Sequence, residues 1–257
     1  MSLIEYRASA NEQMRTQDLL DLTPSSGARA LDVGARDGHF SRLLADRFDS
    51  VVALDLTMPD VSHPKVSCVE GNAAALDFAD GSFDFVLCAE VLEHVPPDIL
   101  PKVCSEMERV CRGQLLIGVP YRQDLRLGRT TCQSCGKQNP PWGHVNSFDG
   151  DRLKGLFAAC SVKSIRYVGR TSLRTNALAA KLMDLAGNPY GTYTQDEACV
   201  HCNGSIGAPS SRDPSRKMLT KLGSWAEQAS QTLTLPRANW IHVLFERQNP
   251  KKIVFAL

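Results

Sequence analysis

The stretch Arg-Ala-Leu-Asp-Val-Gly-Ala-Arg-Asp-Gly-His-Phe-Ser-Arg-Leu-Leu-Ala, residues 29–45, decides how this chain folds. Its first part is a short apolar run that is typical of a buried parallel strand. Gly34 and Gly38 follow as a turn, and apolar residues at helical spacing come next. Glycine admits unusual backbone angles and lets a ligand approach the main chain, while the new helix offers free N–H groups. The stretch therefore predicts a strand, a glycine turn and a helix around a nucleotide-like ligand.

The spacing of the glycines excludes one class of nucleotide-binding protein. A dinucleotide fingerprint, Gly-x-Gly-x-x-Gly, that starts at Gly34 requires glycine where the chain has Arg36 and His39. Residues 32–38 instead resemble the acidic-x-Gly-x-Gly-x-Gly motif of class I S-adenosylmethionine-dependent methyltransferases, with Arg36 in place of the middle glycine. A turn that merely connects a strand to a helix is the alternative interpretation of the same residues.

A carboxylate ends the next apolar run, residues 51–55. Asp55 lies 21 positions after Gly34. At the carboxyl end of a second strand, such a carboxylate is placed to accept hydrogen bonds from both ribose hydroxyls of an adenosine. Leu56 beside it is placed to pack against the adenine. Capping of a turn is the alternative role for Asp55.

The strongest resemblance to this methyltransferase family lies in residues 70–87, Glu-Gly-Asn-Ala-Ala-Ala-Leu-Asp-Phe-Ala-Asp-Gly-Ser-Phe-Asp-Phe-Val-Leu. The family has Gly-Asp-Ala, Leu-Pro-Phe and Phe-Asp at matching intervals, and Asn72 stands here for the first aspartate. The resemblance implies that the Asn72 side chain accepts a hydrogen bond from the adenine amino group, as an amide oxygen can, and that Ala73 offers its backbone N–H to the ring. The implied cofactor-binding residues are Asp32, Gly34, Ala35, Gly38, Asp55, Leu56, Asn72, Ala73 and Glu90.

The order of the expected elements fits the same family. Helices are predicted at residues 96–112 and 153–160, and the last three strands at residues 115–119, 161–168 and 240–247. The expected fold is α/β, a Rossmann-like sheet of seven strands that is mostly parallel with the last strand antiparallel. The resemblance covers residues 25–120 with specific motifs and the remainder by element order.

Two insertions depart from a minimal fold of this kind. They are residues 122–148 and residues 172–237. The remaining segments are expected to form the N-terminal helices and cofactor-binding core (1–121), a further part of the core (149–171), and the last strand with its tail (238–257).

Each insertion contains a Cys-x-x-Cys pair followed by a small or flexible residue. Four thiolates make a closed tetrahedral zinc site. In this fold both insertions leave the carboxyl edge of the sheet, where ligands bind. We therefore expect Cys132, Cys135, Cys199 and Cys202 to hold one structural zinc that ties the insertions into a lid over the active site.

Three other interpretations of the cysteine pairs stay open. A pair could be a redox dithiol, both pairs could be incidental, or His144 or His201 could replace one thiolate. The N-terminus carries an early acidic residue and lacks the apolar core of a signal peptide. We therefore expect a cytoplasmic protein, in which cysteines stay reduced.

Methyl transfer from a sulfonium needs alignment of the nucleophile rather than a catalytic triad. A general base helps when a hydroxyl or amine acceptor must lose a proton, and histidine suits that role near neutral pH. The candidates are His144 beyond the first cysteine pair, His94 after the fourth strand, and then Tyr121. A structural role at a helix N-terminus is the alternative for His94, and Glu93 is expected in the first turn of that helix, where the dipole favours it.

Composition bears on the acceptor. The chain has 257 residues, 43% of them hydrophobic and 22% charged, and a net charge of +1. This is an ordinary globular composition with no general attraction to nucleic acid. Because no apolar run approaches the ~18 residues of a membrane span, we expect no membrane partner.

These features together favour an S-adenosylmethionine-dependent methyltransferase that acts on a small molecule or a sugar-containing metabolite. One alternative is an RNA methyltransferase, since Arg122, Arg126, Arg129 and Lys137 surround the first cysteine pair. The other is a non-catalytic zinc-bearing interaction protein with a degenerate cofactor fold, motivated by Arg36 and Asn72.

Overall fold

The computed structural model describes residues 5, 7–195, 197–209, 213–232 and 234–248. The chain divides into two compact units. The first comprises Met1–Tyr121, Phe148–Gly169 and Asn239–Leu257, and the second comprises Arg122–Ser147 and Arg170–Ala238. Within the described residues, no helix combines the length and the apolar character that crossing a membrane requires.

A seven-stranded sheet forms the first unit, with strand order β3-β2-β1-β4-β5-β9-β8. Strands β1 to β5 pair in parallel, and β9 lies antiparallel between β5 and β8. This arrangement confirms the expected fold class. The strands are β1 (Gly27–Val33), β2 (Phe48–Asp55), β3 (Val66–Glu70), β4 (Phe83–Ala89), β5 (Cys111–Pro120), β8 (Cys160–Val168) and β9 (Trp240–Arg247).

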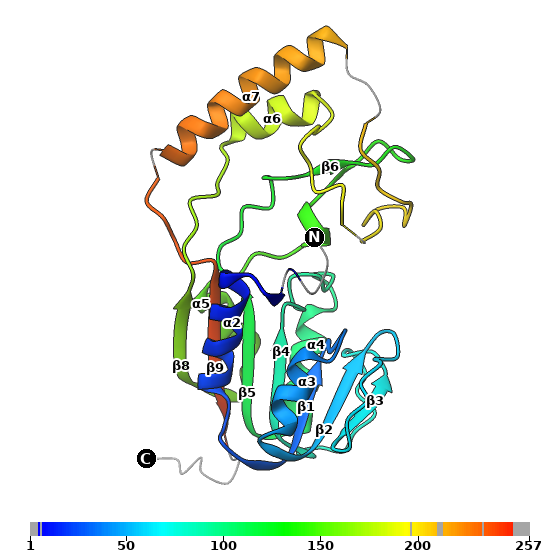
Figure 1. Ribbon diagram of the computed structural model, residues 1–257, viewed down its shortest axis with the longest axis vertical. Coiled ribbons are helices and arrows are strands. Elements are labelled where there is room, and N and C mark those ends of the chain that lie inside the picture. Colours follow the sequence, from blue (N-terminus) through cyan, green and yellow to red (C-terminus); the bar gives the residue numbers. More distant parts are fainter. Residues whose placement is uncertain (1–4, 6, 196, 210–212, 233, 249–257) are drawn as a thin grey trace, which may run out of the picture. The chain divides into compact units, whose positions relative to one another are not determined.

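Helices cover both faces of this sheet (Figure 1). Leu31 of β1 belongs to the apolar cluster with Met107, whereas the adjacent Ala30 belongs to the cluster with Leu19 and Leu44 on the opposite face. Because both faces are buried, the central strands are continuous apolar runs, which made them visible in the sequence. The helices are α2 (Ala10–Leu22) and α3 (His39–Ala45) on one face, and α4 (Leu100–Val110) and α5 (Gly150–Leu156) on the other.

The second unit contains short elements and two helices that lie side by side (Figure 1). The antiparallel pair β6–β7 carries the first cysteine pair in its connection. Tyr193 ties a later segment to this hairpin, because its hydroxyl accepts the Thr131 N–H at 3.0 Å and donates to the Gly187 carbonyl at 3.2 Å. The elements are β6 (Thr130–Thr131), β7 (Gln138–Asn139), the 3-10 turn η1 (Pro141–Gly143), α6 (Ala177–Leu185) and α7 (Pro214–Thr232).

The chain leaves the first unit twice, after Tyr121 at the end of β5 and after Gly169 beyond β8. Strands β5 and β8 run in the same direction, because each is antiparallel to β9. Both excursions therefore start from the carboxyl edge of the sheet. At this edge the Tyr121 N–H donates to the carbonyl of Asn239, where the chain returns, at 2.7 Å.

Candidate cofactor site and cysteine cluster

The loop between β1 and α3 has a left-handed backbone at Gly34, Arg36 and Gly38, with φ of 77°, 47° and 70°. A Cβ on Gly34 would lie 2.2 Å from a methyl group of Val91, and one on Gly38 would lie 2.1 Å from a methyl group of Val61. Glycine is thus required at the outer two positions for both angle and space. Arg36 adopts the same left-handed conformation, so it replaces the middle glycine at the cost of some strain.

Asp55, at the carboxyl end of β2, is fixed by this loop. One carboxylate oxygen accepts the Arg36 N–H at 2.8 Å, and the other accepts the Leu56 N–H at 2.7 Å. Each oxygen keeps a further lone pair for a ligand. The hydrogen bond from the loop backbone therefore holds the Asp55 carboxylate in place before a ligand binds.

Asp32 lies beneath the loop and is 3% exposed. Its carboxylate accepts a hydrogen bond from the Ser41 hydroxyl of α3 at 2.6 Å. Burial raises its pKa to about 6 although the Ser41 hydroxyl opposes the shift, and the charges of Asp55 and Asp37 add to it. The structure thus places Asp32 as a support that joins β1 to α3.

Replacing Asp32 with asparagine is expected to change the pH dependence of stability. The carboxyl has a pKa of about 6 when folded and about 3.9 when unfolded, so its protonated form favours the folded chain. Its contribution is complete below about pH 4 and is lost as the pH rises through about 6. Between these pH values the native chain should lose up to roughly 3 kcal/mol of unfolding free energy relative to Asp32→Asn. Urea unfolding of both proteins measures this, and parallel pH curves would contradict it.

The residues proposed to face the adenine lie beyond β2 and β3. The Leu56 side chain is 71% exposed, so its apolar surface is accessible to a ligand. Asn72 is exposed, and its side-chain oxygen accepts the Ala74 N–H at 2.8 Å. Asn72 therefore shapes its own turn, and one lone pair of its oxygen stays available. Ala73 packs partly against the main core.

Glu90 follows β4 with a left-handed backbone, φ 58°, and its carboxyl group is buried. One oxygen accepts the indole N–H of Trp240 at 3.3 Å. The other is a buried oxygen with no hydrogen-bond partner among the described residues. Burial raises the pKa of Glu90, while the nearby Arg15 charge acts against this. An orphaned carboxylate oxygen at the carboxyl edge of the sheet fits a cationic ligand group.

The expectation for Glu93 was wrong. Residues before a proline avoid helical backbone angles, and Pro96 and Pro97 are adjacent. Helix α4 therefore begins only at Leu100, and Glu93 lies in the preceding turn, fully buried. Both its carboxyl oxygens lack a hydrogen-bond partner among the described residues. Burial, and then the charge of Glu90, raise its pKa well above the ordinary value, so sequence reasoning missed a buried acid at this edge.

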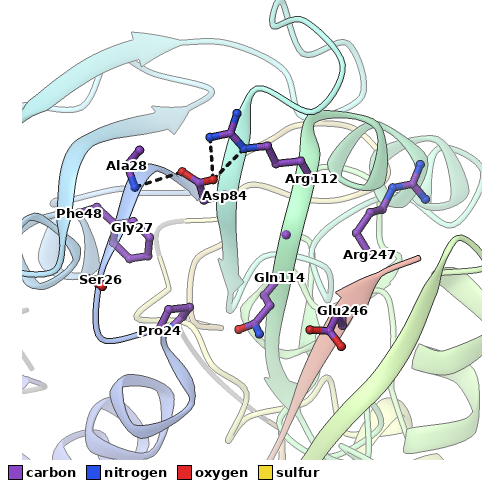
Figure 2. Close-up of a pocket in the computed structure, with 11 residues that line it drawn as sticks. Pro24, Ser26, Gly27, Ala28, Phe48, Asp84, Arg112, Gln114, Glu246 and Arg247 are labelled. Carbon is purple, nitrogen blue, oxygen red and sulfur yellow. Dashed lines mark hydrogen bonds and ion pairs between the residues drawn. The ribbon is translucent and has the colours of Figure 1, made fainter. Parts of the chain in front are cut away.

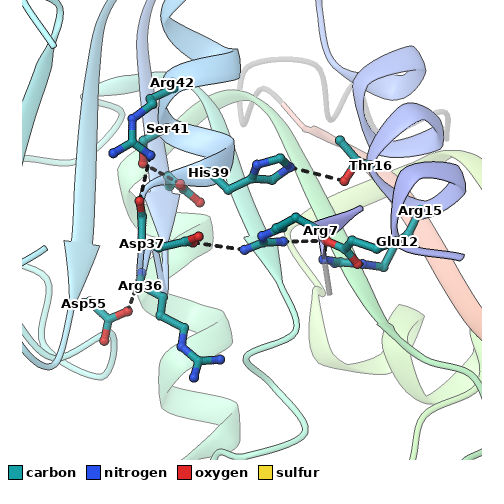
Figure 3. A network of polar contacts seen from close by, with 11 residues as sticks. Arg7, Glu12, Arg15, Thr16, Arg36, Asp37, His39, Ser41, Arg42 and Asp55 are labelled. Carbon is teal, nitrogen blue, oxygen red and sulfur yellow. Dashed lines mark hydrogen bonds and ion pairs between the residues drawn. The ribbon is translucent and has the colours of Figure 1, made fainter. Parts of the chain in front are cut away.

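A network of ion pairs holds the N-terminal segment against the glycine loop (Figure 3). Arg7 pairs with Glu12 of α2 and, at 3.0 Å, with Asp37 of the loop. Arg15 donates two hydrogen bonds to Glu12, at 2.8 and 2.7 Å. Burial raises the pKa of Glu12, but the two guanidinium groups outweigh it and the net shift is downward. No motif in the sequence indicated this connection.

Two of the three candidate bases lie in the first unit. His94 is half-buried in the turn after β4. Its backbone N–H donates to the Val91 carbonyl at 3.0 Å. A carboxyl oxygen of Glu93 and a ring nitrogen of His94 lie within 4.8 Å of each other. Tyr121 directly follows β5, and its ring contacts that of Tyr167 with centroids 5.0 Å apart.

His144 belongs to the second unit and is 9% exposed. Its Nδ1 lies 2.6 Å from the side-chain oxygen of Gln123. The neighbouring Trp142 has a left-handed backbone, φ 51°, and its ring centroid is 6.1 Å from that of His144. A bulky residue with such angles is strained, which is typical of a functional loop.

A pocket lies at the opposite, amino edge of the sheet and is lined by residues of β1, β2, β4, β5 and β9 (Figure 2). Asp84 accepts the N–H groups of Ala28 at 3.1 Å and Arg29 at 2.9 Å, and pairs with Arg112 at 2.7 Å. These contacts tie the beginnings of β1 and β5 to β4. We therefore assign this pocket a structural role.

The four cysteines that were predicted to bind zinc lie close together in the second unit. Their sulfur atoms all lie within 4.8 Å of one another, with Cys132 to Cys202 and Cys135 to Cys199 each at 3.7 Å. No histidine joins this cluster among the described residues. His201 instead contacts the Gln138 carbonyl at 3.0 Å through its ring.

The two cysteine pairs adopt the same turn. The Gly136 N–H donates to the Cys132 carbonyl at 2.9 Å, and the Asn203 N–H donates to the Cys199 carbonyl at 2.8 Å. Both donors have a left-handed backbone, φ 70° and 57°, which glycine and asparagine tolerate best. Asn139 joins the turns, because its side-chain oxygen accepts the Val200 N–H at 2.9 Å.

Backbone donors in these turns favour thiolates. Burial raises the pKa of Cys199, but the N–H groups of His201 and Cys202 outweigh it and lower the pKa to about 6. The Gly204 N–H lowers the pKa of Cys202, but the neighbouring sulfur atoms raise it to about 12. Four close thiolates thus repel one another unless a cation lies among them.

Known proteins resemble the first unit. Residues 31–116 match the family described as methyltransferase domain. A demethylmenaquinone methyltransferase of Beutenbergia cavernae is 38% identical over 109 residues, which cover 40% of this chain and 44% of that protein. A ubiquinone biosynthesis O-methyltransferase of Xanthomonas euvesicatoria is 34% identical over 93 residues, covering 32% of this chain and 39% of that protein. The matches span less than half the length of these curated relatives.

A solved structure shares the fold over a longer stretch. The N-methyltransferase NodS of Bradyrhizobium japonicum gives a TM-score of 0.52 at 13% identity, covering 95% of this chain and 99% of that chain. The sheet order and this likeness define a class I methyltransferase fold. With the family match from β1 to β5, they show that residues 31–116 are similar to a methyltransferase domain and lie in a fold of that class.

Proposed function

We propose that this chain transfers a methyl group from S-adenosylmethionine to a small-molecule or sugar-containing acceptor. The observation that carries the proposal is the loop after β1, which keeps its three left-handed positions although Arg36 replaces glycine, and whose Arg36 N–H holds Asp55 at 2.8 Å. The non-catalytic alternative is motivated by Arg36 and Asn72. The left-handed conformation of Arg36 counts against the first of these two arguments and does not bear on the second.

Four side chains and the loop backbone would hold the cofactor. Asp55 would accept hydrogen bonds from the ribose hydroxyls, and exposed Leu56 would cover one face of the adenine. Asn72 would accept from the adenine amino group. The buried Glu90 oxygen would accept from the ammonium group, which would favour the ionised carboxylate. Gly34 lets the cofactor approach the main chain closely.

The cofactor supplies a methyl group on a sulfonium that is already activated for displacement. The residues of this chain orient the acceptor and exclude water. For a hydroxyl or amine acceptor, His144 is our preferred base. In the neutral tautomer that donates Nδ1–H to the Gln123 side-chain oxygen, the lone pair of His144 lies on Nε2. His94 and Tyr121 are the next candidates, at the carboxyl edge of the first unit.

We also propose that the cysteine cluster holds one structural zinc ion. Thiolates about 2.3 Å from a tetrahedral zinc lie about 3.8 Å from one another, and two pairs of sulfur atoms in the cluster are 3.7 Å apart. All four are free cysteines in the structure, and the two 3.7 Å separations are far longer than the roughly 2.05 Å of a disulfide bond. Zinc would relieve the repulsion between the thiolates. That the second unit serves as a substrate lid stays a prediction from the topology.

A small acceptor is favoured over RNA by the basic residues themselves. Arg126 pairs with Asp124 at 2.9 Å, and Arg129 pairs with Asp184 at 3.1 Å. Two of the arginines near the first cysteine pair therefore form ion pairs within the second unit, which reduces the positive charge that they offer to RNA phosphates. The relatives named for demethylmenaquinone and ubiquinone biosynthesis also support a small acceptor.

A transfer assay with radiolabelled S-adenosylmethionine tests this proposal. We expect label in small hydroxylated, amine or sugar-containing acceptors from a panel, with none in total RNA. Transfer to RNA that falls steeply with salt would overturn the small-molecule class in favour of RNA. Absence of transfer together with absence of cofactor binding would favour the non-catalytic alternative.

A further inference from the structure

Exposed apolar side chains concentrate in the second unit. Among the described residues, 16 large hydrophobic side chains are exposed, and 10 of them belong to this unit, although it is the smaller of the two. Five of the 10 lie on its two helices, α6 and α7. Scattered exposed side chains need no explanation, but a concentration on neighbouring helices indicates a surface that contacts something.

On α7 these side chains form one stripe. Met218, Leu222 and Trp225 follow at intervals of four and three residues, so they share a helix face, and they are 62%, 42% and 59% exposed. The opposite face packs on α6, since a Cβ added to the buried Gly223 would lie 3.3 Å from Met183. The stripe therefore points away from the helix that stabilises α7.

Positive charge accompanies the stripe. Lys217 and Lys221 are exposed on α7, and the Lys221 ammonium lies 5.3 Å from the centre of the Trp225 ring. On α6, Leu178 and Leu185 are 63% and 58% exposed, with exposed Lys181 between them on the same side of the helix. Both helices thus present leucine or tryptophan together with lysine.

A second copy of the chain is a poor occupant for this surface. A three-residue stripe offers a few hundred Å², whereas a stable interface needs about 800 Å² from each partner. In a two-fold contact, the lysines that flank the stripe would also face their own copies. The surface therefore calls for a partner that is negatively charged and has an apolar layer beneath the charge.

We propose that α7 binds the surface of an anionic membrane, lying in the headgroup region with Met218, Leu222 and Trp225 directed toward the acyl chains. Such helices carry lysine on the polar side and tryptophan, leucine or methionine on the other. Lysines beside the stripe contact anionic headgroups. The sequence-based expectation of no membrane partner rested on the lack of a spanning segment, which a helix lying in the interface does not need. This proposal is independent of the proposed methyl transfer.

Flotation of the full chain with lipid vesicles tests the proposal. The probes are vesicles of phosphatidylcholine alone and of phosphatidylcholine with roughly one third phosphatidylglycerol, each at low and high salt. We expect binding to the anionic vesicles, weakened by salt. Lys217→Gln and Lys221→Gln should each lower the partition coefficient about fivefold, and Trp225→Ser should lower it about tenfold. Leu235→Ser and Lys102→Gln change exposed residues elsewhere and should leave it unchanged.

Fluorescence gives a second readout that does not depend on a destabilising variant. Vesicles with brominated acyl chains should quench part of the tryptophan emission, and Trp225→Phe, which keeps an aromatic ring, should remove that part. The proposal is overturned if the native chain fails to bind anionic vesicles, or if the variants at positions 217, 221 and 225 bind like the native chain. Concentration-dependent self-association that Trp225→Ser abolishes, without vesicle binding, would instead assign the stripe to a contact between copies.

Discussion

Replacing Cys199 with serine is expected to abolish binding of the proposed zinc and to unfold the second unit. Cys199 is 3% exposed, and its sulfur lies 3.7 Å from that of Cys135. A structural zinc contributes on the order of 10 kcal/mol to folding, far more than the short β6–β7 hairpin supplies. Apart from α6 and α7, the described part of this unit has no regular element longer than three residues.

Elemental analysis and limited proteolysis measure this effect. The native chain should carry about one zinc per chain, and Cys199→Ser should carry almost none and be cleaved rapidly within the second unit. Cys68→Ser is the matched control, because Cys68 lies in β3 of the first unit and should leave the metal content unchanged. A native chain that is well folded and metal-free would contradict the zinc proposal.

Replacing Gly34 with alanine is expected to lower the unfolding free energy by about 2–3 kcal/mol. About 1 kcal/mol comes from a Cβ in the left-handed region, and the rest from overpacking, since the new Cβ would lie 2.2 Å from Val91. Val91 is β-branched and has few alternative rotamers. The displaced loop should also lose affinity for S-adenosylmethionine, because the Arg36 N–H no longer meets Asp55.

Urea unfolding with two controls isolates the cause. Gly155→Ala in α5 has no atom within 4 Å of the added Cβ and should leave stability unchanged or raise it by up to about 1 kcal/mol. Adding Val91→Ala to Gly34→Ala should recover the unfolding free energy that is lost to the steric clash. It should not recover the part that is lost because alanine disfavours the left-handed backbone. A Gly34→Ala protein as stable as the native chain would show that the loop is more adaptable than its φ of 77° indicates.

The fold of the first unit was largely predictable, because its strands leave a pattern in neighbouring residues of the sequence. Parallel strands buried on both faces are apolar runs, so β1, β4 and β5 were visible in the sequence. Helix boundaries were less accurate. The helix predicted at residues 153–160 begins at Gly150, because the Asp149 side chain accepts the Arg152 N–H at 3.0 Å and caps the helix there.

The candidate site was predictable where chemistry follows a motif and not where it depends on burial. The cysteine cluster was predicted from the two Cys-x-x-Cys motifs and the topology of the insertions, and Asp55 from its place at the end of an apolar run. The buried state of Glu93 was missed, because it depends on a turn set by two prolines further along the chain. The ion pair of Arg7 with Asp37 joins residues 30 positions apart and leaves no local signal.

Calorimetric titration with S-adenosylmethionine tests the central claim most directly, using zinc-replete native chain, Asp55→Ala and Asp49→Ala. Asp49 lies on the same strand as Asp55, near its opposite end, and is exposed, so it is a matched control. We expect micromolar binding to the native chain and to Asp49→Ala, and binding at least about tenfold weaker, roughly 1.4 kcal/mol, to Asp55→Ala. Equal affinity of all three proteins would contradict the proposed place of the cofactor at β1 and β2, and absence of binding to the native chain would contradict the claim itself.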